Sequence, residues 1–548
     1  MLNYKKDNEK GKIAVIALFL KRHVVAVIAL ILILIGGIWS AFILTGNKAG
    51  TGNEANNVKM EDASVIYLAM PPAASYDPLR TDDYYVMGLC QLLYRSLYQL
   101  DSTLNVKEDM VETYTADAAS GTVTIKLKDK LTYSDGSVQT AGDVRFTVDE
   151  IKKAGAASPY YNYVSKIKDV DVEDSQNLII QFASPSDASI DNLIFPIVSS
   201  KDYKAGASFS KGSGPYAIDT VDDKKIALKI NDQYLGEKAK LPIEVSIVGD
   251  PQLYPGLISM EAVTAGFFMD NKAKTQGKSK DLEVKSFPSS QLEYVGFNYS
   301  GTSLMSRSEM RQAVGFAIDR KQLVEDNYAG DGTVSETLYY PNFLNTKKEE
   351  ESYNIKYNPK EAIKKMKSAG LNDSNDDGIL EKSDGSPASV KLLVSKDYPS
   401  RADAAAQIQE TLSKLGLNTT IESVSTEEFW KKIAASDYDI FVSGMTFDKQ
   451  FKMQEMLGTG NYFGFVNKDV DQKVAVLETS LNAEEQKKAF LDLKKALYQQ
   501  MPYVPICYND DYFLSVKSLK GEEFPSFFSP YDGANTWTWQ RKMKNTGK

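Results

Sequence analysis

The stretch LTYSDGSVQTAGDVRFTVDEI, from Leu131 to Ile151, has the pattern of a tight turn followed by the start of a helix. Asp135 and Gly136 suit the turn, because Asp bonds to its own backbone and Gly accepts a positive φ. Thr140 and Asp143 have the spacing of a capping box, which satisfies backbone N–H groups where a helix begins. The apolar residues that follow share one helix face: Val144, Val148 and Ile151.

The four acids of this stretch have structural explanations. Asp135 belongs to the turn and Asp143 to the cap, while Asp149 and Glu150 lie on the polar side of the helix pattern. A catalytic carboxylate pair is the alternative interpretation. Because every acid is explained by a turn, a cap or solvent exposure, we interpret the stretch as part of a fold and not as an active site.

The composition excludes several classes of protein. The 548 residues carry a net charge of -9, which gives no basic surface for nucleic acid. The only histidine is His23, so Ser-His-Asp catalysis, Cys-His catalysis and histidine-ligated zinc are excluded from the body of the chain. We therefore expect no catalytic residues, no metal, no cofactor and no enzymatic activity. A surface hydrolase that uses carboxylates stays open as an alternative.

Two cysteines are present, Cys90 and Cys507, and no Cys-x-x-Cys pair exists. The two could form one disulfide in an oxidising compartment, or they could remain free thiols. The sequence leaves both states open, because it does not give the distance between the two residues.

A membrane anchor is predicted near the N-terminus. Residues 24–44, VVAVIALILILIGGIWSAFIL, carry no charge and are long enough to cross a hydrocarbon core of about 30 Å as a helix. Several Lys and Arg residues precede them, so we expect residues 1–23 in the cytoplasm. A flexible tether is expected at residues 45–63. The expected localisation is the cell membrane, with one span and an extracytoplasmic body; a cleaved signal peptide is the competing interpretation.

Strand and helix patterns alternate in the second half of the chain. The dipeptide Asn358-Pro359 is typical of a helix start. The predicted strands are residues 389–395, 418–424 and 438–443, and the predicted helices between them are residues 404–415 and 426–434. This alternation with short links predicts an α/β protein with parallel strands and with helices on both faces of the sheet.

Several motifs resemble those of the bacterial extracellular solute-binding proteins, family 5, which are the receptors of peptide ABC importers. The resemblance runs in family order from about residue 64 to about residue 540. Its motifs are SYDPL (75–79), LYRSLYQLD (93–101), YSDG with TA and DV (133–144), GSGPYAI (212–218), FNYSGTSLMSRSEMRQAVGFAIDRKQLV (297–324) and MPYVPICY (501–508).

This resemblance implies a two-lobed periplasmic-binding-protein-like fold, type II, class C, with an extra inserted domain. Two hinge strands would join the lobes, near residues 292–297 and 503–507. The implied domains are lobe I at 64–94, 186–295 and 504–548, the inserted small domain at 95–185, and lobe II at 296–503.

A ligand-binding site is expected after the strand that precedes Gly444. Ligands of α/β sheets gather at the carboxyl ends of the strands, and backbone groups there can pair with an extended peptide. In peptide-binding members of the resembled family, an Asp four residues after such a Gly pairs with the α-ammonium group of the peptide, and Asp448 has this spacing. Met445 departs from the aromatic residue that is usual after the Gly, and Asp448 could instead cap the loop. The other expected ligand-binding residues are Thr446, Phe447, Tyr76, Asp82, Asp83, Tyr84, Tyr85 and Trp430.

The segment from Asp373 to Asp384 resembles an EF-hand loop, with Asp in place of the final Glu. We interpret it as an acidic, Gly-containing turn, and calcium binding is the alternative.

The function that these patterns favour is a membrane-anchored receptor that captures oligopeptides between two hinged lobes and delivers them to an ABC importer. The expected partners are the permease subunits and a separate ATPase, because no nucleotide-binding motif is visible in this chain. The alternatives are a peptide-pheromone sensor without transport and a binder of a non-peptide solute.

Overall fold

The structure is a computed structural model that describes residues 60–269, 282–346, 353–448, 451–521 and 525–543. The predicted cytoplasmic segment and membrane helix lie outside the described residues. The last residues of the predicted tether, Met60–Asp62, form strand β1, which pairs with β19 (Gln540–Lys542). Within the described ranges, no helix combines the length and the apolar composition needed to cross a membrane.

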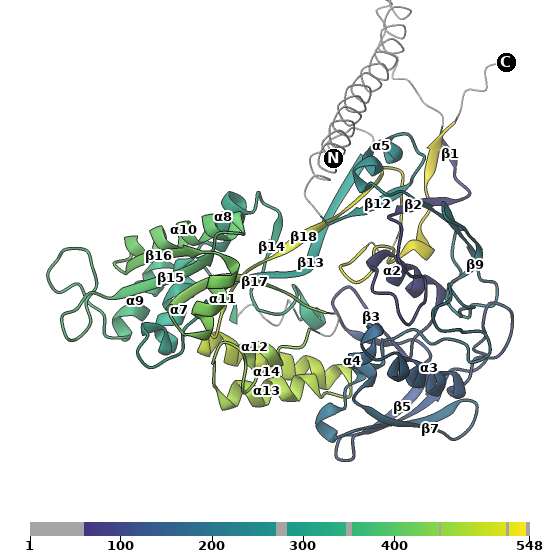
Figure 1. Ribbon diagram of the computed structural model, residues 1–548, viewed down its shortest axis with the longest axis horizontal. Coiled ribbons are helices and arrows are strands. Elements are labelled where there is room, and N and C mark those ends of the chain that lie inside the picture. Colours follow the sequence, from purple (N-terminus) through teal and green to yellow (C-terminus); the bar gives the residue numbers. More distant parts are fainter. Residues whose placement is uncertain (1–59, 270–281, 347–352, 449–450, 522–524, 544–548) are drawn as a thin grey trace, which may run out of the picture. The chain divides into compact units, whose positions relative to one another are not determined.

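Eleven strands form one continuous sheet (Figure 1). Their order is β16-β15-β17-β13-β18-β12-β2-β11-β10-β9, and β14 pairs with β18 beside this path. The bounds of the outer strands are β2 (Ile66–Met70), β9 (Tyr216–Val221), β10 (Lys225–Ile230), β11 (Ile243–Ile247), β12 (Ala265–Phe268), β14 (Gly332–Val334), β15 (Ser389–Ser395), β16 (Asn418–Val424) and β17 (Ile440–Thr446).

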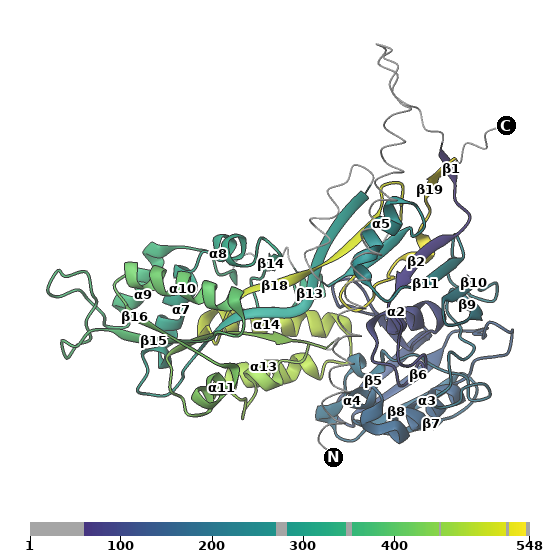
Figure 2. The ribbon, with the colours of Figure 1, turned by 45° about the horizontal axis from the view of Figure 1, so that its top comes forward.

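Two long antiparallel strands connect the two ends of this sheet. They are β13 (Leu282–Phe297) and β18 (Val504–Val516), which lie side by side in Figures 1 and 2. Residues 512–515 of β18 pair with β12, whereas residues 291–297 of β13 pair with β17. The strands on either side are thus joined through this one pair.

The first part of the chain adds helices and two small sheets. Helix α2 (Tyr84–Leu93) and helix α5 (Tyr254–Ser259) lie between strands β2 and β12 in chain order. The region predicted as an inserted domain contains a four-stranded antiparallel sheet of order β5-β6-β8-β7 and the pair β3-β4. The bounds are β3 (Tyr98–Leu100), β4 (Val106–Glu108), β5 (Val111–Asp117), β6 (Thr122–Leu127), β7 (Ile167–Val172), β8 (Asn177–Phe182), α3 (Ala141–Ala154) and α4 (Tyr161–Val164).

The stretch that carries the turn and the capping box forms helix α3. The Asp143 carboxylate accepts hydrogen bonds from Thr140 N at 2.9 Å and from Ser200 N at 2.9 Å. Asp135 accepts one from Ser137 N at 2.9 Å, and Asp149 is exposed. These carboxylates therefore close a turn, begin a helix or face solvent, as their spacing predicts.

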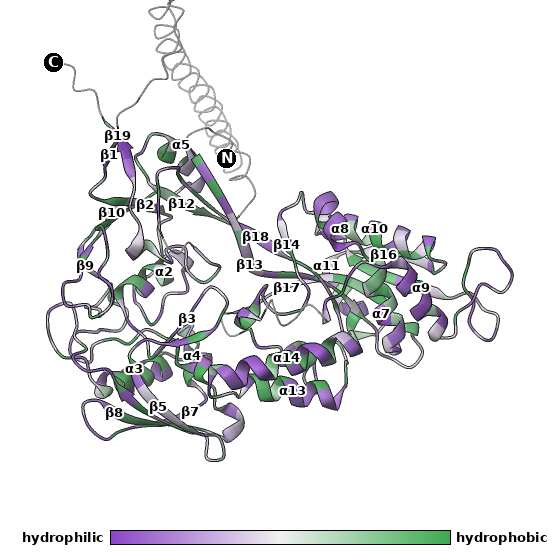
Figure 3. Cartoon of the chain, turned by 180° about the vertical axis from the view of Figure 1, so that it is seen from behind, coloured by the Kyte–Doolittle hydropathy of each residue, from purple (hydrophilic) through white to green (hydrophobic). Residues whose placement is uncertain are grey.

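Helices cover both faces of the sheet at β15 and β17, where alternate residues of each of these two strands enter different cores. Leu392 belongs to the core with α7, α8, α9 and α10, and Leu393 to the core with α11, α12, α13 and α14. Figure 3 shows the mixture of hydrophobic and hydrophilic residues along α14 that an amphipathic helix requires. The bounds are α7 (Ser308–Ala317), α8 (Arg320–Asn327), α9 (Pro359–Ser368), α10 (Pro399–Lys414), α11 (Thr426–Ala434), α12 (Gln454–Leu457), α13 (Lys468–Glu478) and α14 (Ala483–Gln500).

The mixed α/β architecture with parallel neighbours β16, β15 and β17 confirms the predicted fold class at that level. Two elements differ from their predicted bounds. The helix expected at residues 404–415 runs from Pro399 to Lys414, because a proline suits the first position of a helix. The strand expected at residues 438–443 runs instead from Ile440 to Thr446, because the pairing partner β13 continues beyond Gly444 and extends the strand.

Candidate ligand-binding site

The end of β17 has one free backbone edge. β13 pairs with β17 as far as Thr446, whereas β15 pairs with it only from Ile440 to Val442. Phe447 N donates to Ser290 O at 3.0 Å, so the odd-numbered residues of β17 bond to β13. Gly444 and Thr446 therefore direct their N–H and C=O groups to the other edge, where no strand of the described chain pairs with them.

Gly444 also makes room for a partly buried ion pair. Arg401 of α10 forms a bidentate pair with Glu293 of β13, with distances of 2.7 Å from Nε to Oε2 and 2.8 Å from Nη2 to Oε1. A Cβ at position 444 would lie 2.0 Å from Arg401 Nη2 and 2.6 Å from Glu293 Oε1. The side-chain space at Gly444 is thus occupied by this pair, while its backbone edge stays open.

A cavity of about 240 Å³ opens directly after this strand end. It brings the Asp448 carboxylate together with aromatic and apolar side chains from distant parts of the chain. Burial raises the pKa of Tyr163, and the charge of Asp448 is the next cause, which places this hydroxyl close to the carboxylate. The cavity is lined by Met87, Pro159, Tyr163, Ser290, Phe447, Asp448, Phe527 and Phe528.

A second cavity, of about 250 Å³, lies against Tyr98, Tyr234 and Asp532. None of the ligand-binding residues expected from the sequence lines it. The cavity at Asp448 is the better candidate site, because it contains an expected carboxylate and adjoins the free edge of β17.

Tyr84 and Tyr85 stand at the start of α2 and form part of an aromatic wall. The Tyr84 ring packs against Phe267 with centroids 4.7 Å apart, and its hydroxyl donates to Ser526 O at 2.6 Å. The buried Tyr85 donates to Phe267 O at 3.3 Å. Tyr84 lies about one helical turn before Met87, which lines the Asp448 cavity, and Tyr85 lies two residues before it.

The remaining expected residues have other surroundings. Asp83 is the N-cap of α2 and accepts from Val86 N at 3.0 Å, and Asp82 is exposed. Tyr76 packs against Phe209, with ring centroids 5.5 Å apart. Trp430 contacts Phe429 and Tyr462 edge to face. The Asp448 cavity has none of these side chains in its lining.

The sequence did not indicate Tyr163, Phe527, Phe528 or Asp511 as site residues. Tyr163 and the two phenylalanines approach Asp448 from separate segments on either side of it in the sequence, and no local motif marks them. Asp511 lies within β18, and burial together with Asp510 raises the pKa of its carboxyl to about 7. The feature of the sequence that could have indicated Asp511 is an acidic residue within an otherwise hydrophobic strand pattern.

Cys90 and Cys507 are both buried, and neither forms a disulfide. Burial raises the pKa of the Cys507 thiol, and nearby Glu293 adds to the effect. Of the two states that the sequence left open, the structure has two separate thiols.

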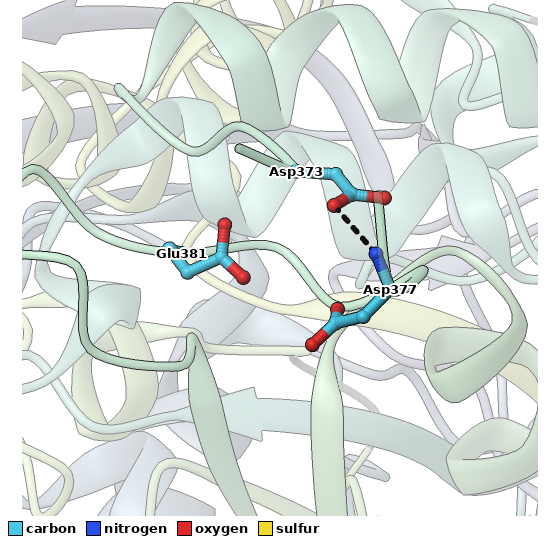
Figure 4. Close-up of side chains that lie close together, drawn as sticks. All are labelled: Asp373, Asp377 and Glu381. Carbon is cyan, nitrogen blue, oxygen red and sulfur yellow. Dashed lines mark hydrogen bonds between the residues drawn. The ribbon is translucent and has the colours of Figure 1, made fainter. Parts of the chain in front are cut away.

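The acidic loop brings Asp373, Asp377 and Glu381 together, with one oxygen of each within 4.8 Å of the others (Figure 4). Its carboxylates accept bonds inside the loop: Asp373 from the N–H groups of Asp377 and Gly378, and Glu381 from Ser374. These are the bonds expected of the acidic turn predicted from the sequence. Asp384 accepts from Ser386 N instead and is not among the three.

The sheet has two halves that join through one strand pair, and a carboxylate-containing cavity lies beside that pair at Ser290, as is common for ligand pockets between two parts of a protein. The family model described as "Bacterial extracellular solute-binding proteins, family 5 Middle" matches residues 105–462. The chain belongs to this family, whose members are the solute- and peptide-binding components of ABC importers and not enzymes.

Individual relatives differ in the ligands that their names give. The chain is 24% identical to the oligopeptide-binding protein AppA of Bacillus subtilis over 475 residues, which cover 82% of this chain and 87% of AppA. The unliganded open form of the periplasmic murein tripeptide-binding protein MppA superposes with a TM-score of 0.72 at 16% identity, covering 88% of this chain and 98% of MppA. A nickel ABC transporter structure from Bacillus halodurans gives 0.70 at 16% identity, covering 86% and 98%. At these identities the two structures establish the fold alone.

Proposed function

We propose that the protein is a membrane-anchored extracytoplasmic receptor that binds oligopeptides in the Asp448 cavity and delivers them to an ABC importer. The observation that carries this proposal is the combination of a free strand edge with a carboxylate directly after it. Gly444 and Thr446 offer backbone groups in the plane of the sheet, and Asp448 follows two residues later at the cavity. An extended chain with a positive end matches both features.

The backbone edge accounts for binding without regard to sequence. A peptide that adds as a strand beside β17 bonds through its own N–H and C=O groups, which every peptide has. Arg401 and Glu293 fill the side-chain space at Gly444 and leave this edge accessible. The ligand therefore gains affinity from its backbone and is placed in register by its end.

Asp448 is the proposed partner of the α-ammonium group. Asp448 itself is exposed in this structure, and it is bordered by the Phe447 ring, stacked on Phe451 with centroids 4.9 Å apart, and by the buried Tyr163; closure around a peptide would remove water from this corner. A desolvated ammonium–carboxylate pair is strong, and removal of one partner typically costs about 2–5 kcal/mol. Asp448 thus fixes where the peptide begins.

The anchor and the transport role follow from the N-terminal composition and from the family. Residues 24–44 would hold the body at the extracytoplasmic surface and raise its concentration near the permease. Closure of the protein around the peptide, through bending at β13 and β18, would present the loaded form to the permease, and a separate ATPase would drive release. AppA, named as an oligopeptide-binding protein, supports oligopeptides as the ligand class.

The proposal is tested by titrating free-amine and N-acetylated forms of the same peptides into the full-length protein by calorimetry. Asp448→Asn should weaken the free-amine peptides by about thirtyfold or more, in line with a loss of at least 2 kcal/mol, and leave the acetylated peptides unchanged. Asp149→Asn, an exposed acid on α3, is the matched control. Equal weakening of both peptide forms, or none, would contradict the role of Asp448.

A non-peptide solute is the second candidate, because one structural neighbour is a nickel ABC transporter protein from Bacillus halodurans. A screen of metal chelates and sugars that gives tighter binding than any peptide would favour it.

A further inference from the structure

Asp511 is a carboxylate for which the proposed function gives no role. It lies in β18 directly opposite Phe287 of β13, and it is half-buried. Among the described residues, no hydrogen bond or ion pair is made to its carboxylate, and the one charge that acts on it is the like charge of Asp510. A carboxylate in this position is costly unless a cation meets it.

Asp511 and Asp510 point to opposite faces of the sheet, because neighbouring residues of a strand alternate. Asp510 accepts a hydrogen bond from Thr333 Oγ1 of β14 at 2.8 Å. Asp511 therefore points to the face of the sheet opposite the Asp510–Thr333 bond. Phe287, its partner across the strands, lies on the same face, and the Phe287 ring packs against Phe267 with centroids 5.7 Å apart.

The charge of Asp511 affects the hydroxyls of three tyrosines. Burial raises the pKa of Tyr84 and of Tyr340, and in both cases the charge of Asp511 is the next cause. For Tyr85 the causes are burial, then Asp83, then Asp511. The carboxylate thus lies within the electrostatic range of all three hydroxyls.

None of these three hydroxyls donates to Asp511, because each donates to a backbone carbonyl. Tyr84 donates to Ser526 O at 2.6 Å, Tyr340 to Pro288 O at 2.8 Å, and Tyr85 to Phe267 O at 3.3 Å. These hydroxyls therefore do not neutralise the charge of Asp511 through a hydrogen bond. Ring faces beside a carboxylate are the combination that binds ammonium and guanidinium groups.

The aromatic residues near Asp511 contact residues of the candidate ligand site. Phe527 lines the Asp448 cavity, and its ring lies 5.0 Å from that of Tyr340. Tyr84 is connected to the same segment through its bond to Ser526 O. A peptide that begins at Asp448 would therefore pass along residues that also surround Asp511.

We propose that Asp511 is a second anionic subsite of the ligand-binding site and that it takes the cationic side chain of a lysine or arginine in the bound peptide. This inference rests on the proposed function, because it names a preferred class of peptide for the same site. The subsite determines specificity by charge, whereas Asp448 determines where the chain begins.

The proposal includes a dependence on pH. Because the pKa of Asp511 is raised to about 7, the carboxylate carries its full charge only above neutral pH. The preference for basic peptides should therefore be largest near pH 8 and decrease toward pH 6. The titratable groups that face Asp511 or lie beside it are Asp510 and Tyr512 on β18, Tyr84 and Tyr85 on α2, and Tyr340.

The test uses alanine pentapeptides with free amino termini, each with one lysine at position two, three, four or five, and matched peptides with norleucine in its place. Calorimetry with the full-length protein near pH 8 should give about tenfold tighter binding of the lysine form at one of these positions. Asp511→Asn should abolish this difference and leave the norleucine affinities unchanged. Asp510→Asn, whose side chain bonds on the other face, should preserve it. An equal preference in the Asp511→Asn variant, or no preference in the wild type, would overturn the proposal.

A second measurement does not depend on peptides. n-Butylamine hydrochloride at neutral to weakly alkaline pH should raise the melting temperature of the wild type more than potassium chloride at equal ionic strength does, and this excess should vanish in Asp511→Asn. An excess that persists in the variant, or that is absent from the wild type, would refute the cation subsite. If no peptide binds any variant, the peptide-receptor function fails, and the butylamine comparison still decides the role of Asp511.

Discussion

The guanidinium of Arg401 lies over Gly444 and forms two hydrogen bonds with the Glu293 carboxylate. The two charged groups occupy the space that a side chain at position 444 would need. Glu293 is 3% exposed. Rupture of such a buried pair leaves an uncompensated charge and is strongly destabilising. The glycine at the end of β17 therefore has a structural role besides its proposed contact with ligand.

Gly444→Ala should lower the free energy of unfolding by about 2–4 kcal/mol, because the new methyl group displaces the guanidinium. Denaturant titration measures the change. In an Arg401→Ala background the same substitution should cost less, since the guanidinium is gone and the Glu293 carboxylate, 2.6 Å from the new Cβ, can move into the vacated space. Additive effects of the two substitutions would contradict this account of the glycine.

Asp143 should prove structural and not functional. Its carboxylate accepts from Thr140 N and from the N–H and hydroxyl of Ser200. Asp143→Asn replaces one acceptor oxygen by a donor that faces other donors, and we expect a loss of about 2–3 kcal/mol of stability with unchanged ligand affinity. The exposed Asp149→Asn should change stability by less than about 0.5 kcal/mol. A selective loss of binding in Asp143→Asn would favour a functional role.

The Asp511 carboxyl should make the protein less stable as the pH rises. Its pKa is raised to about 7 in the folded protein. The folded state therefore retains a proton that the unfolded state releases at lower pH, so stability decreases with pH from about 4 to about 7. Asp511→Asn removes this contribution. It should raise the melting temperature near pH 8 and change it little near pH 4. A variant that is equally stabilised at both values would contradict the raised pKa.

The acidic loop at Asp373 should not need a cation, because its carboxylates are occupied by bonds within the loop. Addition of calcium chloride or of EDTA to the full-length protein should leave the melting temperature unchanged in scanning calorimetry. A rise with calcium that is abolished by Asp377→Asn would instead support the EF-hand interpretation.

Local patterns predicted much of the fold. Residues 389–395 and 418–424 form strands with the predicted bounds, because a strand between turn residues depends on its own alternation. The start of α3 at Thr140 follows from two residues three positions apart. The end of β17 was predicted too early, since its last residues are ordered by pairing with Gln291 and Leu292, which are far away in the sequence.

The candidate site was less predictable for the same physical reason. Gly444 and Asp448 could be indicated by spacing along one segment. Tyr163 and Phe527 enter the cavity from other segments, and their approach depends on tertiary packing that no short motif encodes. Asp511 gains its unusual pKa only after β13 and α2 have removed it from water.

The central claim is that the protein retains peptides without altering them. The most direct measurement is to incubate the purified full-length protein with a mixture of peptides of defined lengths, to remove the unbound material, and to identify the retained molecules by mass spectrometry. The account predicts that peptides with free amino termini are enriched and are recovered with unchanged mass. Retention of no peptide, or recovery of cleaved or modified products, would contradict it.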